Sequence, residues 1–219
     1  MARKARVEFD GAIYQVLDRG DRREAIFVGH ADRERFRACL AETCGRTGLR
    51  VHRCVLMGNH DHLLLETPEP NLVAGMKWLQ GTYTRRCNRR HRLRGHLFQG
   101  GYKALPVECG GRDDYFAAVS EYIHLNPVPA RMVEATEGAL EGYRWGSYPQ
   151  FAGARGLPGW LSRTEVFAQL GLPDGRAGSR RRYGTWMTRR AREATDRTTS
   201  LEHAADRPGR ADARGGGRA

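Results

Sequence analysis

The sequence predicts an α+β domain built on an antiparallel sheet. Short β-type runs alternate with amphipathic helical segments along residues 12–125, which is the pattern of a sheet with packed helices. Two of the expected strands are separated only by the turn pair Gly58 and Asn59, and so short a connection joins antiparallel strands. The length of 219 residues allows one such domain with extensions.

The first expected elements are a strand and a helix. Residues 12–17 form a short β-type run that is followed by a polar loop. Residues 31–48 place Phe36 and Leu40 at a helical spacing and end at Gly48. This pattern predicts an amphipathic helix with a C-terminal stop.

The middle of the chain predicts a strand pair, a second helix and a further strand. Residues 49–57 and 62–66 flank the turn as antiparallel strands. Asn71 is expected to cap a helix that runs to about Arg86. Residues 96–107 then indicate a strand or hairpin.

A third helix completes the expected core of the domain. It would begin at a cap formed by Asp113 or Asp114 and run to about Leu125. Asn126 and Pro127 end it, because proline disfavours helical geometry in the residue before it. The resulting order β, α, β, β, α, β, α predicts a ferredoxin-like antiparallel sheet with helices on one face.

The organisation of the chain predicts three parts. Residues 1–152 would form the main domain, residues 153–194 a short helical C-terminal extension, and residues 195–219 a disordered tail rich in Arg, Gly and Ala. The tail has too few apolar residues to offset the entropy of ordering it. The Arg-rich residues 179–192 would add phosphate contacts or keep the tail in solution.

Composition favours a polyanionic partner. Lys and Arg number 37 against 25 Asp and Glu, which gives a formal net charge of +12 and indicates nucleic acid. A membrane partner is not indicated, because no basic helix is apolar enough to lie on a bilayer. The N-terminal residues also lack the apolar segment of a secretion signal. The five cysteines contain no Cys-x-x-Cys pair, which predicts reduced thiols and a cytoplasmic location.

The stretch MGNHDHLLLE, residues 57–66, carries the main candidate for a chemical site. Its Gly-Asn-His-Asp letters are typical of calcineurin-like phosphoesterases, but the separated motifs that complete a two-metal centre in those enzymes are absent. On a strand, His60 and His62 instead point to one face with Cα atoms about 6 to 7 Å apart, a reach at which they can hold one cation. A chance alternation of two histidines at a strand end is the other interpretation.

A second candidate lies in EYIHLNPV, residues 121–128. Tyr122 and Asn126 are four residues apart, so their side chains share a face of the last helical turn. The phenol would be a nucleophile and the amide oxygen a third metal ligand. Because a tyrosine is almost fully protonated at neutral pH, this role requires a nearby cation or base. A core tyrosine before a helix-ending Asn-Pro pair is the alternative.

A basic stretch without any acidic residue runs from Asn71 to Val107. Arginine forks match phosphate geometry, so we expect this stretch to bind DNA. The residues expected to contact DNA are Arg85, Arg86, Arg89, Arg90, Arg92, Arg94, Tyr83 and Lys103, with His91 and Phe98 also available for base stacking. The alternatives are a solvated basic helix end and, for Tyr83, a packing role.

Three motifs in order resemble the single-tyrosine HUH transposases of the IS200-like family, particularly their REP-associated tyrosine transposase branch. The motifs are MGNHDHLLLETP, GTYTRRCNRRHRLRGHLFQGGYKA and YIHLNPVPARMV. The segment YRWGSYPQFAG also resembles that branch, so the resemblance covers residues 8–152.

The resemblance implies a metal-dependent enzyme that cleaves single-stranded DNA and transfers the strand through a 5′-phosphotyrosine intermediate. His60 and His62 match the metal-binding histidines and Tyr122 the nucleophile, while Asn126 would complete the metal site. Tyr83 and Tyr115 are the rival tyrosines. The implied metal is Mg²⁺ or Mn²⁺, and the implied partner is single-stranded DNA with hairpins at repetitive palindromes. Members of the family work as monomers or as dimers with shared sites, so the resemblance leaves a monomer and a homodimer as alternatives. A bacterial cytoplasmic location, nucleoid-associated on DNA, is also implied.

Three positions depart from the family pattern. Asp61 stands where the family usually has a bulky apolar residue, and Gly101 and Pro129 stand where arginine is common. If Asp61 faces the helices, it would be a buried carboxylate that needs a partner. A second hypothesis is therefore a catalytically weak, domesticated protein that binds hairpin DNA. A third hypothesis, a metallophosphatase, requires two bound metals.

Overall fold

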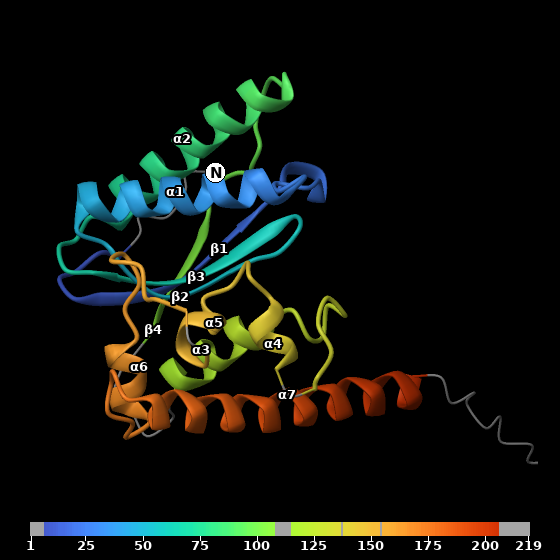
Figure 1. Cartoon of the computed structure of the whole chain (residues 1–219). Coiled ribbons are helices and arrows are strands. Elements are labelled where there is room, and N and C mark those ends of the chain that lie inside the picture. The colour runs from blue at the N-terminus through green and yellow to red at the C-terminus, as the bar shows by residue number, and fades with distance from the viewer. Residues whose placement is uncertain (1–6, 108–114, 137, 154, 206–219) are drawn as a thin grey trace, which may run out of the picture.

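The computed structural model describes residues 7–107, 115–136, 138–153 and 155–205, the last ten of these by their backbone only. A four-stranded sheet lies at the centre (Figure 1), in the spatial order β2-β3-β1-β4 with every neighbouring pair antiparallel. Its strands are β1 (Ala12–Arg19), β2 (Arg50–Leu56), β3 (His60–Thr67) and β4 (Lys103–Val107). The α+β class and the antiparallel sheet are thus confirmed.

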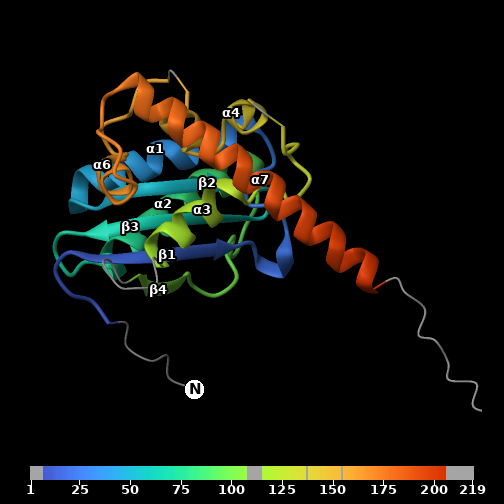
Figure 2. The same cartoon turned by 90° about the horizontal axis from the view of Figure 1, so that it is seen from below.

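Helices cover both faces of this sheet, not one face as the sequence suggested. The long helices α1 (His30–Thr47) and α2 (Leu72–His91) lie on one face, and α3 (Tyr115–Leu125) lies on the other with the C-terminal helices (Figures 1 and 2). The reason is the composition of β3. Leu63, Leu64 and Leu65 follow one another and are at most 1% exposed, and consecutive strand residues point to opposite faces. Both faces therefore need a cover.

The helices on the first face end close to where the sequence predicts. Helix α1 stops at Gly48, which has a left-handed φ of 70°, as glycine permits without strain. Helix α2 runs on to His91, past the expected end near Arg86. Asn71 occupies the position before α2 but does not cap it. Its amide instead donates a hydrogen bond to the carbonyl of Thr47 at 2.8 Å, which ties α2 to the end of α1.

The second face is built from α3 and the residues that follow it. Helix α3 ends at Leu125, immediately before Asn126 and Pro127, as expected. The expected cap at Asp113 or Asp114 lies outside the described residues. The shorter helices that follow α3 are α4 (Ala139–Gly142), α5 (Tyr148–Phe151) and α6 (Thr164–Gln169), and the 3-10 helix η1 (Asp21–Arg23) lies between β1 and α1.

Helix α7 (Ala177–Ala205) lies beneath α3 and α5 (Figure 1). Its residues Tyr183, Met187 and Ala191 are at most 1% exposed and belong to the main hydrophobic core. The C-terminal extension is thus packed as part of the domain, and its helix continues past Thr195, where the sequence predicted a disordered tail. Residues 206–219 lie outside the described residues. Within the described chain, no helix is both long and apolar enough to cross a membrane.

Candidate active site

Strand β3 directs two histidines to the face that α3 covers. The ring centroids of His60 and His62 lie 5.2 Å apart, as the two-residue period of a strand requires. The neighbouring strand β1 places Leu17 opposite His62 and Arg19 opposite His60. Because directly paired residues of antiparallel strands point to the same face, the guanidinium of Arg19 shares this face with both imidazoles.

Helix α3 brings the tyrosine and the asparagine to the same place. The ring of Tyr122 lies 5.3 Å from the ring of His62, edge to face. The side-chain amide nitrogen of Asn126 lies 3.4 Å from Nε2 of His62. Tyr122 is 49% exposed, whereas His62 is 4% exposed. The four residues singled out in the sequence therefore meet, with the phenol half-exposed and His60 partly exposed.

Burial keeps both imidazoles in the neutral form that a metal ion requires. It lowers the pKa of His62 to about 4, and the charges of His60 and Arg19 add to this effect. Burial, followed by the charge of Arg19, also lowers the pKa of His60. Nδ1 of His60 lies 2.7 Å from the side-chain oxygen of Asn59. Since that oxygen can only accept a hydrogen bond, Nδ1 of His60 carries the proton and Nε2 keeps a lone pair.

The available donors fit one divalent cation. Within the described part of the chain, no three His, Cys, Asp or Glu side chains come together as a metal-binding group, and the Asn126 amide is the polar group nearest to His62 that could add a third donor. Rotating the Asn126 amide by half a turn exchanges its nitrogen and oxygen, an assignment that hydrogen-bonding partners decide. The amide oxygen would then face His62. Two imidazoles and one oxygen do not select a single metal.

A buried polar network fixes α3 behind the candidate nucleophile. His124 lies two residues after Tyr122 on the inner side of the helix. Its Nδ1 is 2.8 Å from the hydroxyl of Tyr183 on α7, and its Nε2 is 2.7 Å from the hydroxyl of Ser147. Both ring nitrogens are thus satisfied, and the network holds α3 at a fixed position over the sheet.

The centre of this network is a buried arginine that the sequence analysis did not single out. The guanidinium of Arg53 lies 3.5 Å from the ring centroid of Phe151 and donates to the hydroxyl of Tyr183 at 3.4 Å. Burial lowers the pKa of Arg53 to about 10, which leaves the side chain charged at neutral pH. A cation in this position is stabilised by the aromatic face. A charged residue inside an apolar strand is the only sequence signal that marks it.

Asp61 points to the opposite face of the sheet from the histidines. It is fully buried, and it is paired across the strands with Asp18 of β1. Burial raises the pKa of Asp61 well above its usual range, and the neighbouring Asp18 raises it further. The expectation of a buried carboxylate is therefore confirmed, and protonation removes its charge.

The predicted DNA-binding residues separate into two groups. Tyr83 is fully buried and donates a hydrogen bond to the carbonyl of Ile26 at 2.6 Å, so it packs in the core and does not offer a surface to DNA. Arg86 is paired with Glu42 at 2.7 Å, and Arg90 is paired with Asp32 at 3.2 Å. Arg90 is exposed despite its ion pair, and the other exposed side chains of the set are Arg85, Arg89, Arg92, Arg94 and Lys103.

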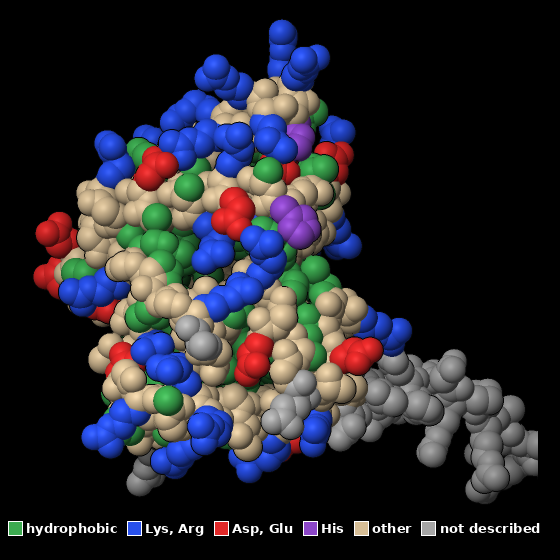
Figure 3. All heavy atoms as spheres, in the orientation of Figure 1, with side chains coloured by type: hydrophobic (Ala, Val, Ile, Leu, Met, Phe, Trp, Pro, Cys, Tyr) green, Lys and Arg blue, Asp and Glu red, His purple; other side chains and the backbone are tan. Residues whose placement is uncertain are grey.

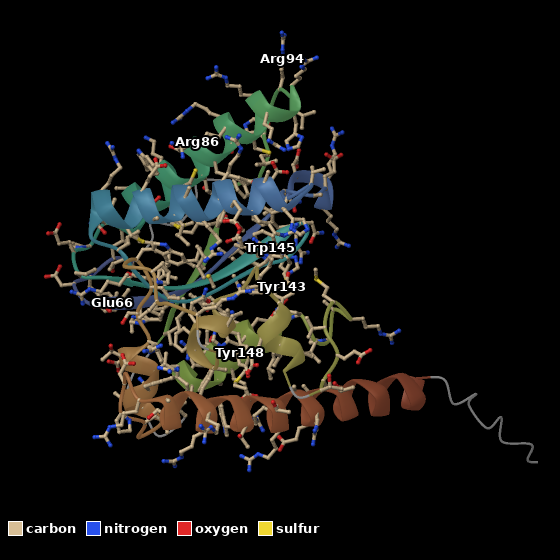
Figure 4. All side chains as sticks on the ribbon, in the orientation of Figure 1. Glu66, Arg86, Arg94, Tyr143, Trp145 and Tyr148 are labelled. Carbon is tan, nitrogen blue, oxygen red and sulfur yellow. The ribbon has the colours of Figure 1, made fainter. Side chains whose placement is uncertain are left out.

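The exposed arginines gather at the end of α2. Lys and Arg side chains cover this end of the molecule in the space-filling view (Figure 3). Figure 4 shows Arg86 and Arg94 there, on the side opposite to Tyr148 beneath the sheet. The chain after α2 returns to the histidines, because the amide of Gln99 donates to the carbonyl of Arg19 at 2.8 Å. Of the proposed stacking residues, Phe98 is buried and His91 is bonded to Asp32 at 2.9 Å.

Two basic residues flank the histidines on their own face. Lys103 of β4 is paired with Leu17 of β1, which is in turn paired with His62 of β3. This register places Lys103 and Arg19 on the α3 side of the sheet, beside the imidazoles. The sequence analysis named Lys103 but missed Arg19. Only the pairing of strands far apart in the sequence reveals the position of Arg19.

The family model described as "Transposase IS200 like" matches residues 9–126, which span all four residues of the site. The chain belongs to the IS200-like transposase family. It is therefore a member of a family of DNA transposases, and the family resemblance seen in the sequence is confirmed.

Solved structures agree with this assignment at the level of the fold. A REP-associated tyrosine transposase bound to a REP hairpin superposes with a TM-score of 0.57 at 16% identity, covering 72% of this chain and 88% of that chain. A transposase-like protein of Deinococcus radiodurans R1 gives a TM-score of 0.40 at 21% identity, covering 56% and 95%, which is too low to support an argument. No curated protein matches the IS200-like transposase described here.

Proposed function

We propose that this IS200-like transposase cleaves and rejoins single-stranded DNA beside a hairpin, with Tyr122 as its nucleophile. The observation that carries the proposal is the contact of Tyr122 with His62, whose ring centroids lie 5.3 Å apart. A half-exposed phenol beside two neutral imidazoles combines an accessible nucleophile with a place for a cation. Tyr115, the rival in the same helix, is 42% exposed at the opposite end of α3.

In the proposed step, the phenolic oxygen of Tyr122 attacks the phosphorus of the scissile phosphate. A bond forms between that oxygen and phosphorus, and the bond from phosphorus to the 3′-oxygen of the upstream nucleotide breaks. The phenol proton passes to solvent, and the leaving oxygen takes up a proton to become a free 3′-hydroxyl. Attack by a 3′-hydroxyl on the phosphotyrosine reverses the step and joins a strand, so no nucleotide cofactor is consumed.

His60, His62 and Asn126 would hold one divalent cation, with Mg²⁺ or Mn²⁺ as the proposed ion. When bound, such an ion supplies Lewis-acid polarisation of the phosphate. The protein contributes the fixed geometry: the His124 network positions α3, and the hydrogen bond from His60 to Asn59 orients the first imidazole. Arg19 and Lys103, on the same face, would contact the phosphates on either side of the cleavage point.

The proposed DNA partner carries a hairpin next to the cleaved strand. A relative of similar fold was solved with a REP hairpin, and Arg85, Arg89, Arg92 and Arg94 form an exposed basic surface at the end of α2. The segment 97–99 links this surface to Arg19 through backbone hydrogen bonds. We propose that the hairpin stem binds the α2 end and that its single-stranded flank passes the end of β1 to reach Tyr122.

A covalent-adduct assay tests the function. The protein is incubated with labelled hairpin-bearing single strands and Mn²⁺, and the covalent protein–DNA product is resolved on a denaturing gel. We expect the adduct with wild-type protein and with Tyr115→Phe, which serves as the matched control. Tyr122→Phe should abolish it, because the nucleophilic oxygen is lost.

Two results would contradict the proposal. An adduct that persists in Tyr122→Phe would remove the nucleophile assignment. Tight hairpin binding without any adduct in the wild-type protein would favour the alternative function, a hairpin-binding protein without strand transfer.

A further inference from the structure

A small pocket opens beside Tyr122, between α3 and α7. It has a volume of about 280 Å³, and Tyr122 and Asn126 form the wall nearest to the histidines. The remaining α3 wall comes from Ala118 and Leu125, and the opposite wall comes from Ala194 of α7. The pocket therefore lies next to the proposed point of chemistry, with the side chain of Tyr122 between the two.

The chemistry of the pocket is apolar with a polar rim. Ala118, Leu125, Pro129 and Ala194 provide apolar surface, and Glu121 and Arg190 provide the polar groups. Arg190 donates from Nε to Glu121 at 2.8 Å and is also paired with Glu193. Because Glu121 is only 15% exposed and is held by this ion pair, its carboxylate has a fixed position at the rim. The same ion pair holds α7 against α3.

We propose that this pocket receives the base of the nucleotide whose 5′-phosphate becomes attached to Tyr122, an inference that rests on the proposed function. Once the phenolic oxygen is bonded to phosphorus, the sugar and base of that nucleotide are tethered beside Tyr122. The pocket is the concave surface at that place. Its volume lies just below the range of about 300 to 1,000 Å³ for drug-sized ligands, which suits one flat ring system. Enzymes that hold an unstacked base combine apolar walls with a few polar edge groups in the same way.

The polar rim selects among the bases. Arg190 donates to Glu121 and Glu193, so the group of the rim offered to a base is the carboxylate of Glu121. A carboxylate oxygen accepts hydrogen bonds and pairs with an exocyclic amino group, as glutamate does with cytosine. Adenine, cytosine and guanine carry such a group, and thymine does not. The pocket therefore disfavours thymine at the first position of the strand attached to Tyr122.

The experiment uses a library of hairpin-bearing single strands with randomised flanks. The full chain is incubated with the library and Mn²⁺, the covalent adducts are purified, and the attached strands are sequenced from their tyrosine-linked end. For the wild-type protein we expect each amino-bearing base to exceed thymine at the first position by at least about fivefold. The uncleaved library provides the reference frequencies.

Two substitutions fill the pocket from opposite walls, Ala194→Phe from α7 and Ala118→Phe from α3. Both variants should reduce the base preference at the first position to less than about twofold. Because the phenyl ring occupies the place of the base, they should also give less adduct than the wild-type protein on ordinary strands. Their adduct yield should recover on a strand that has an abasic site at the first position. Ala38→Phe, at an exposed position of α1, is the matched control and should keep the wild-type preference. Thermal unfolding of each variant verifies that it is folded. If one of the two pocket-filling variants does not fold, the other still tests the proposal.

The failures of the two proposals are distinguishable. Wild-type adducts with equal base frequencies would overturn the pocket assignment and leave the proposed function intact. The same holds if both pocket-filling variants keep the wild-type preference. The absence of any wild-type adduct would contradict the proposed function and, with it, this inference.

Discussion

The two faces of β3 carry polar residues with different roles: histidines of the proposed site on one face and a buried carboxyl on the other. His60 and His62 point toward α3, beside the half-exposed Tyr122. Asp61, between them in sequence, points toward α2 and is fully buried. Burial removes charge on both faces, because it lowers the pKa of His62 and raises the pKa of Asp61. Among the described residues, the histidine face lies beside the half-exposed Tyr122, and the proposed cation would replace the lost charge there.

The face of β3 that carries Asp61 is packed against β1 and α2. Asp18 lies opposite Asp61, and Gln80 of α2 donates a hydrogen bond to Asp18 at 2.6 Å. Neither side-chain oxygen of Asp61 has a hydrogen-bond partner within the described residues. Two adjacent carboxyls in an apolar layer cannot both ionise without a large cost. The proposed chemistry therefore lies on one face of β3, and the buried carboxyls on the other face carry a stability cost.

The largest expected effect is on the histidine face. His62→Ala should lower the rate of adduct formation by at least about 100-fold. Removing a residue that only orients a metal ligand typically costs about 10- to 100-fold in activity, and removing the ligand itself should cost more. The rate is measured in the Mn²⁺ adduct assay. His91→Ala, which removes a histidine bonded to Asp32, is the control and should keep the rate. Wild-type rates in His62→Ala would place the chemistry elsewhere.

On the face that carries Asp61, a substitution is expected to raise the stability of the fold and to leave adduct formation unchanged. The raised pKa of Asp61 means that the folded protein keeps a proton which the unfolded chain releases, so this proton stabilises the fold at low pH and the contribution is lost as pH rises. Asp61→Asn removes that dependence. It should raise the free energy of unfolding by about 1 to 3 kcal/mol at pH 8 and by much less near pH 4. Urea unfolding across this range measures the difference.

Asp10→Asn, at an exposed position, is the matched control and should show no such pH-dependent gain. An Asp61→Asn difference that is constant between pH 4 and pH 8 would contradict a raised pKa of Asp61 in the folded protein. A loss of adduct formation in Asp61→Asn would contradict the separation of the two faces.

The sequence reveals this arrangement only in part. Strand alternation places His60 and His62 on one face because the period of a strand is fixed by its backbone. The spacing of Tyr122 and Asn126 defines one helix face for the same reason. The facing of Asp61 with Asp18 depends instead on the register between β1 and β3, which joins residues far apart in the sequence.

The roles of other residues depend on packing that no local pattern records. Tyr83 lies among arginines in the sequence, yet it packs against Phe27, Phe36 and Phe98. Helix α7 is arginine-rich, yet Tyr183 on its inner side completes the Arg53 network. In both cases one buried face of a basic helix decides the role, and the average composition of the segment hides it.

A smaller effect is expected from the residue that supports the carboxylate pair. Gln80→Ala removes the donor to Asp18 and should lower the free energy of unfolding by about 1 kcal/mol at pH 8. Chemical denaturation measures it, with the exposed Gln99→Ala as control. A free energy of unfolding unchanged in Gln80→Ala would contradict a stabilising role for this hydrogen bond.

The smallest effect is expected from Arg19, the basic residue that faces His60. Arg19→Gln should weaken binding of hairpin-bearing single strands by only a few-fold, since one phosphate contact among several is lost. The decisive measurement is the slope of log affinity against log salt, which should fall in magnitude by about 1. Arg35→Gln, at an exposed position of α1 on the other side of the sheet, should leave the slope unchanged. If Arg19→Gln also leaves it unchanged, the strand does not pass the end of β1, and the route to Tyr122 must approach from the α7 side.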